Sequence, residues 1–351
     1  MATFSVTGVR LAGVSATVPR AVVETSEFAD LRPEEREKFV KLTGVQRRRR
    51  ASAEMCTSDM CFHAAESLLR ELAWSPGDVS LLVFVSQSND YVMPATSLLL
   101  QNRLGLPKSA IAFDVGLGCS GYVYGLAIAT QMLAGLGGGK ALLLAGETPS
   151  KMTNPRDRST APLFGDAGTA TALEVDKAAP PIHFDLGSDG GGGEAIIVRE
   201  GSYRHPVTAA TLEPKTYDGG VVRCGNQLAL DGPAIFNFSV QVTPGTVAAA
   251  LRQAGCAPEA VDWFVFHQAN RLMNEQIRKK LKIPEAKYPY SLGDFGNTSS
   301  AAIPLTMVTA CRDDLRSQAR RLVLCGFGVG LSWGTAVLET RALAVPLLGE
   351  I

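Results

Sequence analysis

A single cysteine, Cys119 in "FDVGLGCSGYVYGLAIA" (Phe113–Ala129), has the setting in this chain that most favours covalent chemistry. A strand-like run leads into Gly116 and Gly118, and a helix-like run begins at Ser120. The positive end of a helix dipole favours the thiolate, the nucleophilic form of cysteine. Backbone N–H groups at such a turn can also bind an oxyanion. The setting predicts a nucleophile, whereas an arbitrary cysteine is usually a small buried hydrophobe.

Two other polar residues lie where a site can form. His267 in "FVFHQAN" follows an apolar, strand-like run, and Asn297 in "DFGNTSSAAIP" lies in a glycine turn. Taken alone, His267 could be a hydrogen-bonded histidine near the core, and Asn297 could be a turn residue that tolerates left-handed geometry. Their places in an internal repeat favour a functional role for both.

An internal repeat relates the two halves of the chain. The segments "SLLVFVSQSND" (Ser80–Asp90) and "VDWFVFHQANR" (Val261–Arg271) are alike. Each half then continues in the same order: "RLGLP" or "KLKIP", a short strand, a glycine turn, and a final strand-like run, which is "ALLLAGE" in the first half and "RLVLCGFG" in the second. Matched landmarks are 177 to 181 residues apart. Conserved order and spacing indicate a duplicated unit. We predict an N-terminal half, residues 1–180, that carries the cysteine, and a C-terminal half, residues 181–351, that carries the histidine and asparagine.

Each half alternates apolar strands with helices, which predicts an α/β fold of mixed, mainly parallel sheets covered by helices on both faces. The short second strands are expected at Ala110–Val115 and Lys287–Leu292. Sites in such sheets form beyond the carboxyl ends of strands. Two related halves should therefore bring Cys119, His267 and Asn297 together.

The composition excludes several classes of protein. Among 351 residues, 46% are hydrophobic and 19% are charged, which is typical of a large buried core. Lys+Arg and Asp+Glu are both 34, so no net charge recruits nucleic acid. The most apolar stretch, Tyr122–Gly139, contains five glycines and two polar residues, and reads as a buried helix rather than a membrane span. Seven cysteines without a leader segment predict a cytoplasmic protein.

Several motifs together resemble ketoacyl-acyl-carrier-protein synthase III, a condensing enzyme of the thiolase superfamily. They are, in chain order, "TGVQRRR", "GLGCSG", "LFGDAGTATAL", "LALDGPAIFNF", "HQANRL", "GNTSSAAIPL" and "GFGVGLSWG". The resemblance covers essentially the whole chain. It implies the thiolase-like five-layer αβαβα fold and a homodimer.

The resemblance also implies a reaction and its residues. Cys119 would accept an acyl group from a thioester, and His267 and Asn297 would donate hydrogen bonds to a malonyl thioester while it loses carbon dioxide. The resulting carbanion would attack the acyl-cysteine and give a 3-oxoacyl thioester. Backbone N–H groups of Cys119 and Val329 would hold the acyl oxyanion; Val329 stands where relatives often have glycine, so its side chain narrows the space beside it. We expect no cofactor and no metal.

The carrier of the acyl group is predicted from positions at which this sequence differs from the family pattern. Relatives that use coenzyme A commonly sandwich adenine between a tryptophan and an arginine; here the tryptophan position is Lys38, a neighbouring arginine position is Leu42, and the second arginine is kept as Arg158. Loss of a stacking face costs about 1–3 kcal/mol. An acidic acyl carrier protein could bind near the "HQAN" helix through Arg271, Lys279 and Lys280. We predict that it rivals coenzyme A as donor, with malonyl-acyl carrier protein as extender.

The sequence leaves the acyl chain and the acceptor group open. Met93 in "DYVMPAT" falls where the partner subunit closes the acyl pocket in the family, and its flexibility leaves the acyl chain undetermined. The same fold could instead move an acyl group to a hydroxyl or amine without decarboxylation, or serve as a non-catalytic dimerisation partner, which the intact Cys–His–Asn set argues against. The loop "CGFGVGLSWG" opens a strand-like rather than a helix-like run, which argues against dinucleotide binding.

Overall fold

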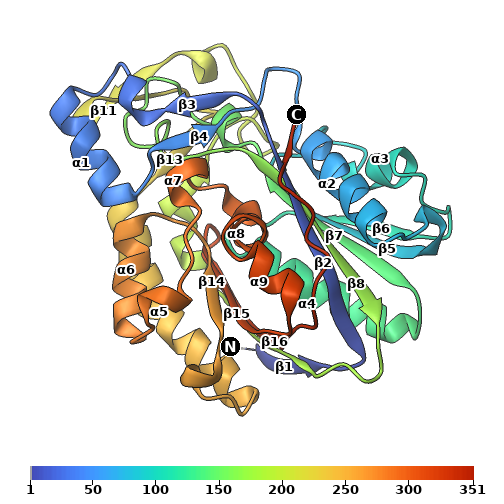
Figure 1. Cartoon of the computed structure of the whole chain (residues 1–351). Coiled ribbons are helices and arrows are strands. Elements are labelled where there is room, and N and C mark those ends of the chain that lie inside the picture. The colour runs from blue at the N-terminus through green and yellow to red at the C-terminus, as the bar shows by residue number, and fades with distance from the viewer. Residues whose placement is uncertain (1) are drawn as a thin grey trace.

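Two mixed β-sheets form the frame of the molecule in the computed structural model, which describes residues 2–351 (Figure 1). The six-stranded sheet has the order β17-β2-β8-β7-β5-β6, with strands at Gly349–Glu350, Val9–Val18, Ala167–Val175, Lys140–Glu147, Val79–Val85 and Ile111–Val115. The five-stranded sheet has the order β1-β9-β16-β15-β14, with strands at Ala2–Val6, Ile182–Ser188, Ser332–Glu339, Arg321–Gly328 and Trp263–Phe266. Three small two-stranded sheets pair β3 with β4, β10 with β13 and β11 with β12 (Val22–Glu24, Arg47–Arg49, Ile196–Val198, Leu228–Leu230, Lys215–Tyr217 and Val221–Arg223).

Helices form three layers around the two large sheets. Helices α4 (Gly121–Leu136) and α8 (Ala302–Ala310) lie between the sheets and contact strands of both. Helices α2 (Thr57–Glu71) and α3 (Thr96–Arg103) cover the outer face of the six-stranded sheet, and α5 (Gly232–Gln253) covers that of the five-stranded sheet and packs on α6 (Arg271–Lys280). Helix α1 (Pro33–Thr43) contacts α6, α7 (Leu292–Phe295) contacts β4, and α9 (Arg312–Ser317) contacts α8. The expected five-layer αβαβα fold is confirmed.

Strand β5 shows why these sequences form a layered core. Alternate side chains of a strand point to opposite faces of the sheet. Leu81, Val83 and Val85 pack in the cluster that contains α4, whereas Leu82 and Phe84 pack in the cluster that contains α2. Both faces of the strand are covered by helices, so an almost uninterrupted apolar run is required.

The duplication is visible in strand order. The sequence β2-β8-β7-β5 in one sheet matches β9-β16-β15-β14 in the other, and the pairs β5–β7 and β14–β15 are both parallel. The five-stranded sheet is otherwise antiparallel, and β16 returns directly from β15 through a tight turn. Strand β1 joins the sheet of the second half and β17 joins that of the first. The division of the chain at residue 180 stays a prediction.

One expected strand, Lys287–Leu292, is not formed. A 3-10 turn at Glu285–Lys287 is followed by irregular chain and then by α7, whereas its counterpart β6 is a regular edge strand. Pro289 cannot donate a ladder hydrogen bond. The side-chain amide of Gln268 replaces the ladder, since it donates to the carbonyl of Pro289 at 3.4 Å and accepts from the N–H of Ser291 at 3.1 Å.

Among the described residues, α5 is the single helix whose length and apolar composition would suffice to cross a membrane. It packs on β9, β15 and β16, and residues such as Val247, Ala250 and Leu251 are buried against that sheet. Its apolar character is therefore explained by its place as a core helix of the outer layer.

Candidate active site

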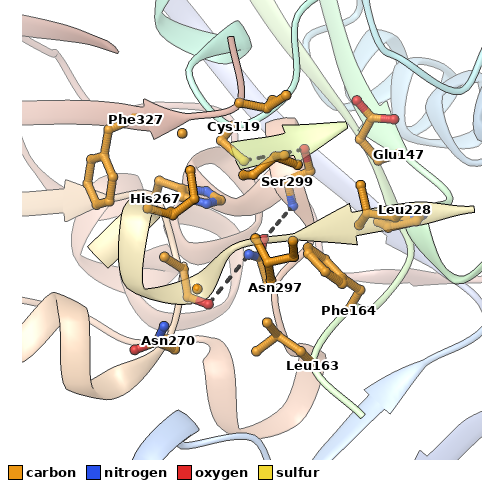
Figure 2. Close-up of a pocket in the computed structure, with 18 of the residues that line it drawn as sticks. Cys119, Glu147, Leu163, Phe164, Leu228, His267, Asn270, Asn297, Ser299 and Phe327 are labelled. Carbon is orange, nitrogen blue, oxygen red and sulfur yellow. Dashed lines mark hydrogen bonds between the residues drawn. The ribbon is translucent and has the colours of Figure 1, made fainter. Parts of the chain in front are cut away.

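The carboxyl ends of matched strands open into one cavity of about 460 Å³ (Figure 2). Cys119 lies between β6 and α4, His267 follows β14, and Asn297 lies between α7 and α8. All three line the cavity, as does Val329 at the end of β15. The duplicated fold thus brings His267 and Asn297, which lie 148 and 178 positions after Cys119 in the sequence, to the same cavity as the cysteine.

Cys119 is buried, with 8% of its surface exposed, and precedes by two residues the start of α4 at Gly121. Its Sγ lies 3.9 Å from the hydroxyl oxygen of Ser299. Burial raises the pKa of the thiol, while hydrogen bonds from the backbone N–H of Val329 and from Ser299 act in the opposite direction. Because burial outweighs them, the thiol rather than the thiolate is the resting form, and attack on a thioester must be accompanied by loss of the thiol proton.

His267 is almost completely buried and is held from two sides. Its backbone N–H donates to the carbonyl of Cys325 at 2.8 Å, and its ring stands at 85° to that of Phe327 with centroids 5.6 Å apart. Burial lowers the pKa of the imidazole to about 4, opposed by a hydrogen bond with the backbone of Ser299. The ring is therefore neutral at pH 7. Its Nδ1 is buried and has no hydrogen-bond partner among residues 2–351.

The amide of Asn297 has a fixed orientation. Its Oδ1 accepts from the N–H of Ser299 at 2.9 Å, and its Nδ2 donates to the carbonyl of Ala269 at 3.4 Å. The backbone is held by the N–H of Asn297 donating to Leu163 and by the N–H of Gly165 donating to Asn297. An amide nitrogen carries two hydrogens. One N–H of Asn297 is therefore left for a ligand in the cavity.

Ser299 is a functional candidate that its sequence context did not reveal. Its φ of +51° lies in the left-handed region, which a non-glycine residue adopts at a cost that the surroundings must offset. In this conformation its hydroxyl faces Cys119 and its N–H donates to Asn297. One residue thus bonds two of the three predicted site residues, Cys119 and Asn297 (Figure 2). The only sequence signal was its place two residues after Asn297, where "GNTSS" reads as a turn.

Glu147 is a second candidate that the sequence did not reveal, although it ends the strand "ALLLAGE" in the same wall of the cavity. It is buried, and its carboxyl accepts from the N–H of Gln87 at 2.9 Å and from the hydroxyls of Ser88 at 2.7 Å and Ser86 at 3.3 Å. Burial raises its pKa to about 8, with a further contribution from Cys119. At neutral pH the group is therefore mostly protonated. It holds in place the turn that follows β5.

The remaining predicted binding residues lie outside this cluster. Met93 is 75% exposed and does not line the cavity of its own chain. Arg158 is paired with Glu35, Nη2 to Oε1 at 2.6 Å. Arg271 begins α6 next to the cavity-lining Asn270, whereas Lys279 and Lys280 are exposed at the other end of that helix.

Two family models match the chain. The model of 3-oxoacyl-[acyl-carrier-protein] synthase III matches residues 113–190, and the model of its C-terminal region matches residues 251–340. The beta-ketoacyl-[acyl-carrier-protein] synthase III of Desulfitobacterium hafniense is 33% identical over 332 residues, which cover 94% of this chain and 97% of that relative. The chain belongs to the 3-oxoacyl-(acyl-carrier-protein) synthase III family. The resemblance seen in the motifs is confirmed.

Relatives and solved structures of the synthase III family agree along the chain. The beta-ketoacyl-[acyl-carrier-protein] synthase III of Rhodopirellula baltica is 31% identical and covers 95% of this chain and 98% of its own. The crystal structure of a 3-oxoacyl-(acyl-carrier protein) synthase from Burkholderia xenovorans is 38% identical, with a TM-score of 0.93 over 100% of this chain and 99% of that one. The synthase III of Pseudomonas aeruginosa superposes with a TM-score of 0.82 at 27% identity over 97% and 100% of the two chains. The chain is therefore an enzyme of the synthase III type.

Proposed function

We propose that this enzyme transfers an acyl group from an acyl thioester to Cys119 and then condenses it with malonyl-acyl carrier protein to give a 3-oxoacyl thioester. The observation that carries the proposal is the convergence of one buried thiol, one buried imidazole and one amide with an unused N–H on a single cavity. Membership of the synthase III family supports the same reaction.

In the first half-reaction the sulfur of Cys119 attacks the acyl carbonyl carbon. The carrier thiol leaves with the proton that the cysteine loses, so no net charge is created in the buried site. The N–H groups of Cys119 and Val329 stabilise the oxyanion of the tetrahedral intermediate; the bond between Val329 and the sulfur supports this role for the second group. Cysteine suits the step because it is both a nucleophile and a good leaving group.

In the second half-reaction the malonyl thioester carbonyl accepts hydrogen bonds from His267 and Asn297. Carbon dioxide leaves, and its bonding electrons form an enolate whose oxygen these two donors stabilise. The enolate carbon attacks the acyl carbonyl, and the Cys119–acyl bond breaks to return the cysteine as a thiolate, which takes up a proton from water. A neutral imidazole suits this role, because burial holds the pKa of His267 near 4. Loss of one such donor typically costs about 100- to 1,000-fold in rate.

Acyl carrier protein is our proposed rival to coenzyme A as acyl donor. Lys38 offers no aromatic face on α1, and Arg158 is already bound by Glu35. Burial of a stacking face would otherwise add about 1–3 kcal/mol. The exposed cations Arg271, Lys279 and Lys280 on α6 suit an acidic carrier that presents its prosthetic arm to the cavity.

A homodimer is our proposal for the assembled enzyme. Strand β6 ends the six-stranded sheet with unpaired backbone groups on its outer edge, and Ile111 on it is exposed. The neighbouring loop and α3 expose Tyr91, Val92, Met93 and Leu98. An exposed edge strand flanked by an apolar patch favours pairing with another chain. A second copy there would let its Met93 approach the acyl end of the cavity. A cytoplasmic location without a membrane or nucleic-acid partner stays a prediction.

Mass spectrometry of the intact enzyme tests this function. Incubation with acetyl-coenzyme A or acetyl-acyl carrier protein should add one acetyl group, located on Cys119 by peptide mapping. Subsequent addition of malonyl-acyl carrier protein should release carbon dioxide and remove the label. If acylation occurs and the label passes to a hydroxyl or amine acceptor without release of carbon dioxide, the chain is an acyltransferase of the same fold and the condensation is excluded.

A further inference from the structure

A row of polar side chains crosses the outer face of the five-stranded sheet, where α5 covers it. Its members are paired in register on four neighbouring strands: Thr3, Asp185, Thr335 and Cys325. Phe184 packs between the two sheets, so its neighbour Asp185 points the other way, toward α5. Thr3 Oγ1 donates to Oδ1 of Asp185 at 3.0 Å, and Thr335 Oγ1 donates to Sγ of Cys325 at 3.3 Å. This polar row leads into the protein from Thr3, which is exposed on the edge strand β1.

Helix α5 turns a stripe of hydroxyls toward the polar row. Ser239, Thr243 and Thr246 are spaced by four and three residues, which places them on one face of the helix. All three are completely buried. The hydroxyl of Thr246 contacts the row, because it bonds the carbonyl of Asp185 at 3.2 Å and the hydroxyl of Thr335 at 3.1 Å. The other end of this α5 stripe is at the catalytic cavity, since Ser239 is one of the residues that line it.

Four buried polar atoms of this layer have no hydrogen-bond partner among residues 2–351. They are Oγ of Ser239, Oγ1 of Thr243, Oδ2 of Asp185 and Nε1 of Trp333. Buried polar groups in proteins are almost always bonded, and ordered water bonds those that no protein group reaches. The α5 stripe rises about 10 Å from Ser239 to Thr246, a length that about three hydrogen-bonded water molecules can span.

The proposed condensation consumes one proton in every turnover. The malonyl carboxylate leaves as uncharged carbon dioxide, and its electrons pass through the enolate to the sulfur of Cys119, which is released as a thiolate. Burial raises the pKa of this thiol, so the thiolate takes up a proton. The 3-oxoacyl product on its carrier arm still fills the cavity at that moment. A second route for the proton, away from the mouth of the cavity, therefore has a function.

We propose that a chain of water molecules, bound by the α5 stripe and the polar row, carries this proton from solvent at β1 to the catalytic cavity. The inference rests on the proposed function, because an acyl transfer without decarboxylation consumes no proton. A water molecule at the solvent end gives up a proton and leaves hydroxide in the solvent. Each water then passes one proton along the chain, and the sulfur of Cys119 receives the last. Hydroxyl groups suit such a chain because each can both donate and accept a hydrogen bond.

The test compares product formation with proton uptake in single turnovers of the full-length acetylated enzyme with malonyl-acyl carrier protein. Quenched flow measures the 3-oxoacyl product, and a pH-indicator dye in weak buffer measures the proton before carbon dioxide hydrates. In the wild type we expect equal rate constants for both. Thr243→Val should slow proton uptake relative to product formation by about tenfold, and Thr243→Ser, which keeps the hydroxyl, should restore the wild-type ratio.

Thr130→Val is the matched control. Thr130 is also buried on a helix, but its hydroxyl already bonds the carbonyl of Leu126 at 2.7 Å, so its loss should leave the ratio unchanged. A crystal structure of the enzyme at high resolution should show ordered water on Oγ1 of Thr243 and Oδ2 of Asp185. If the layer is dry instead, Thr243→Val removes an unsatisfied hydroxyl and raises the urea midpoint of unfolding.

Three results would overturn the inference: a dry layer, proton uptake that keeps pace with product formation in Thr243→Val, or an equal lag in Thr130→Val. In all three cases Cys119 is acetylated and condenses. Failure of Cys119 to take up the acetyl group, or transfer of that group without release of carbon dioxide, would instead contradict the proposed function.

Discussion

The two halves of the molecule place different buried residues at equivalent strand ends. Ser86 and Glu147 lie one and two residues beyond the paired residues Val85 and Ala145 of β5 and β7. His267 and Phe327 lie at the same distances beyond the pair Phe266 and Cys325 of β14 and β15. In the first half a carboxyl is bound by a backbone N–H and two hydroxyls. In the second an imidazole packs against an aromatic ring, and its buried Nδ1 has no partner within the described part of the chain, residues 2–351.

This difference shows that equivalent strand ends of one fold can hold a structural polar group in one half and a candidate functional group in the other. A fully bonded polar group such as Glu147 stabilises the turn around it, whereas a buried donor without a partner is costly unless a ligand uses it. The glycine turns follow the same division. Cys119 precedes α4 and supplies the nucleophile, while Asn297 precedes α8 and supplies a donor.

The largest expected effect is the loss of acylation when Cys119, in the glycine turn of the first half, is replaced. Cys119→Ser should reduce acyl-enzyme formation by several orders of magnitude, because a serine hydroxyl has a much higher pKa than a thiol and, among residues 2–351, the side chain bonded to the Cys119 sulfur is that of Ser299, which is not a base. Intact mass after incubation with acetyl-coenzyme A measures the loss. Condensation by the serine variant at a rate near that of the wild type would exclude Cys119 as the acyl carrier.

The second half should act on a different step. His267→Ala and Asn297→Ala should each retain measurable acylation of Cys119 but lose about 100- to 1,000-fold in decarboxylation, because each removes one donor to the enolate. Release of carbon dioxide from malonyl-acyl carrier protein and acetyl labelling are measured on the same preparations. A variant that decarboxylates normally and fails to acylate would reverse the assignment of roles.

Glu147 should make the fold less stable as pH rises. Its pKa is raised to about 8 in the folded protein, so its contribution is fully present below the ordinary carboxyl pKa and is lost as pH rises through 8. Between pH 5 and pH 8 we expect the free energy of unfolding of the wild type to fall by about 3 kcal/mol relative to Glu147→Gln, which cannot ionise. Urea unfolding of both proteins at the two pH values gives the difference. A constant difference would show that the carboxyl does not titrate in this range.

His267 should give the opposite slope. Its pKa is lowered to about 4, so the unfolded chain takes up the proton first and stability is lost as pH falls from about 6.5 toward 4. Relative to His267→Gln, the wild type should lose about 2 kcal/mol of unfolding free energy between pH 7.5 and pH 5. The same urea series provides the measurement. Slopes of equal sign for Glu147 and His267 would remove the contrast between the two strand ends.

The smallest expected effect compares the two helices near the cavity, α1 of the first half and α6 of the second. Lys38→Trp should restore a stacking face on α1 and raise kcat/KM for acetyl-coenzyme A by about tenfold, while kcat/KM for acetyl-acyl carrier protein stays the same. In the unaltered enzyme we expect the carrier protein to equal or exceed coenzyme A. A strong wild-type preference for coenzyme A would contradict the proposed donor without affecting the roles of Cys119, His267 and Asn297.

The layered fold, the duplication and the three candidate site residues could be predicted from the sequence, because each corresponds to a local pattern. Apolar runs of strand length, glycine turns and a constant offset near 180 residues can be read along the chain. The expected strand at Lys287–Leu292 was wrong, because the amide of Gln268, remote in sequence, binds the segment that Pro289 keeps out of a ladder. The sequence setting of Cys119 indicated a helix terminus that favours the thiolate, but no local motif reports burial, which raises the pKa of the thiol.

Residue types and their order by themselves determined which groups can do chemistry in this protein: a thiol at a helix start, an imidazole at a strand end and an amide in a turn. The tertiary structure alone decided which atoms of those groups are free. The left-handed turn at Ser299 joins Cys119 and Asn297, and the bond to Glu147 holds the backbone of Gln87 close to Gly118. Hydrogen-bond satisfaction, burial and close packing depend on neighbours far apart in the chain, so these properties arise only when the two halves fold together.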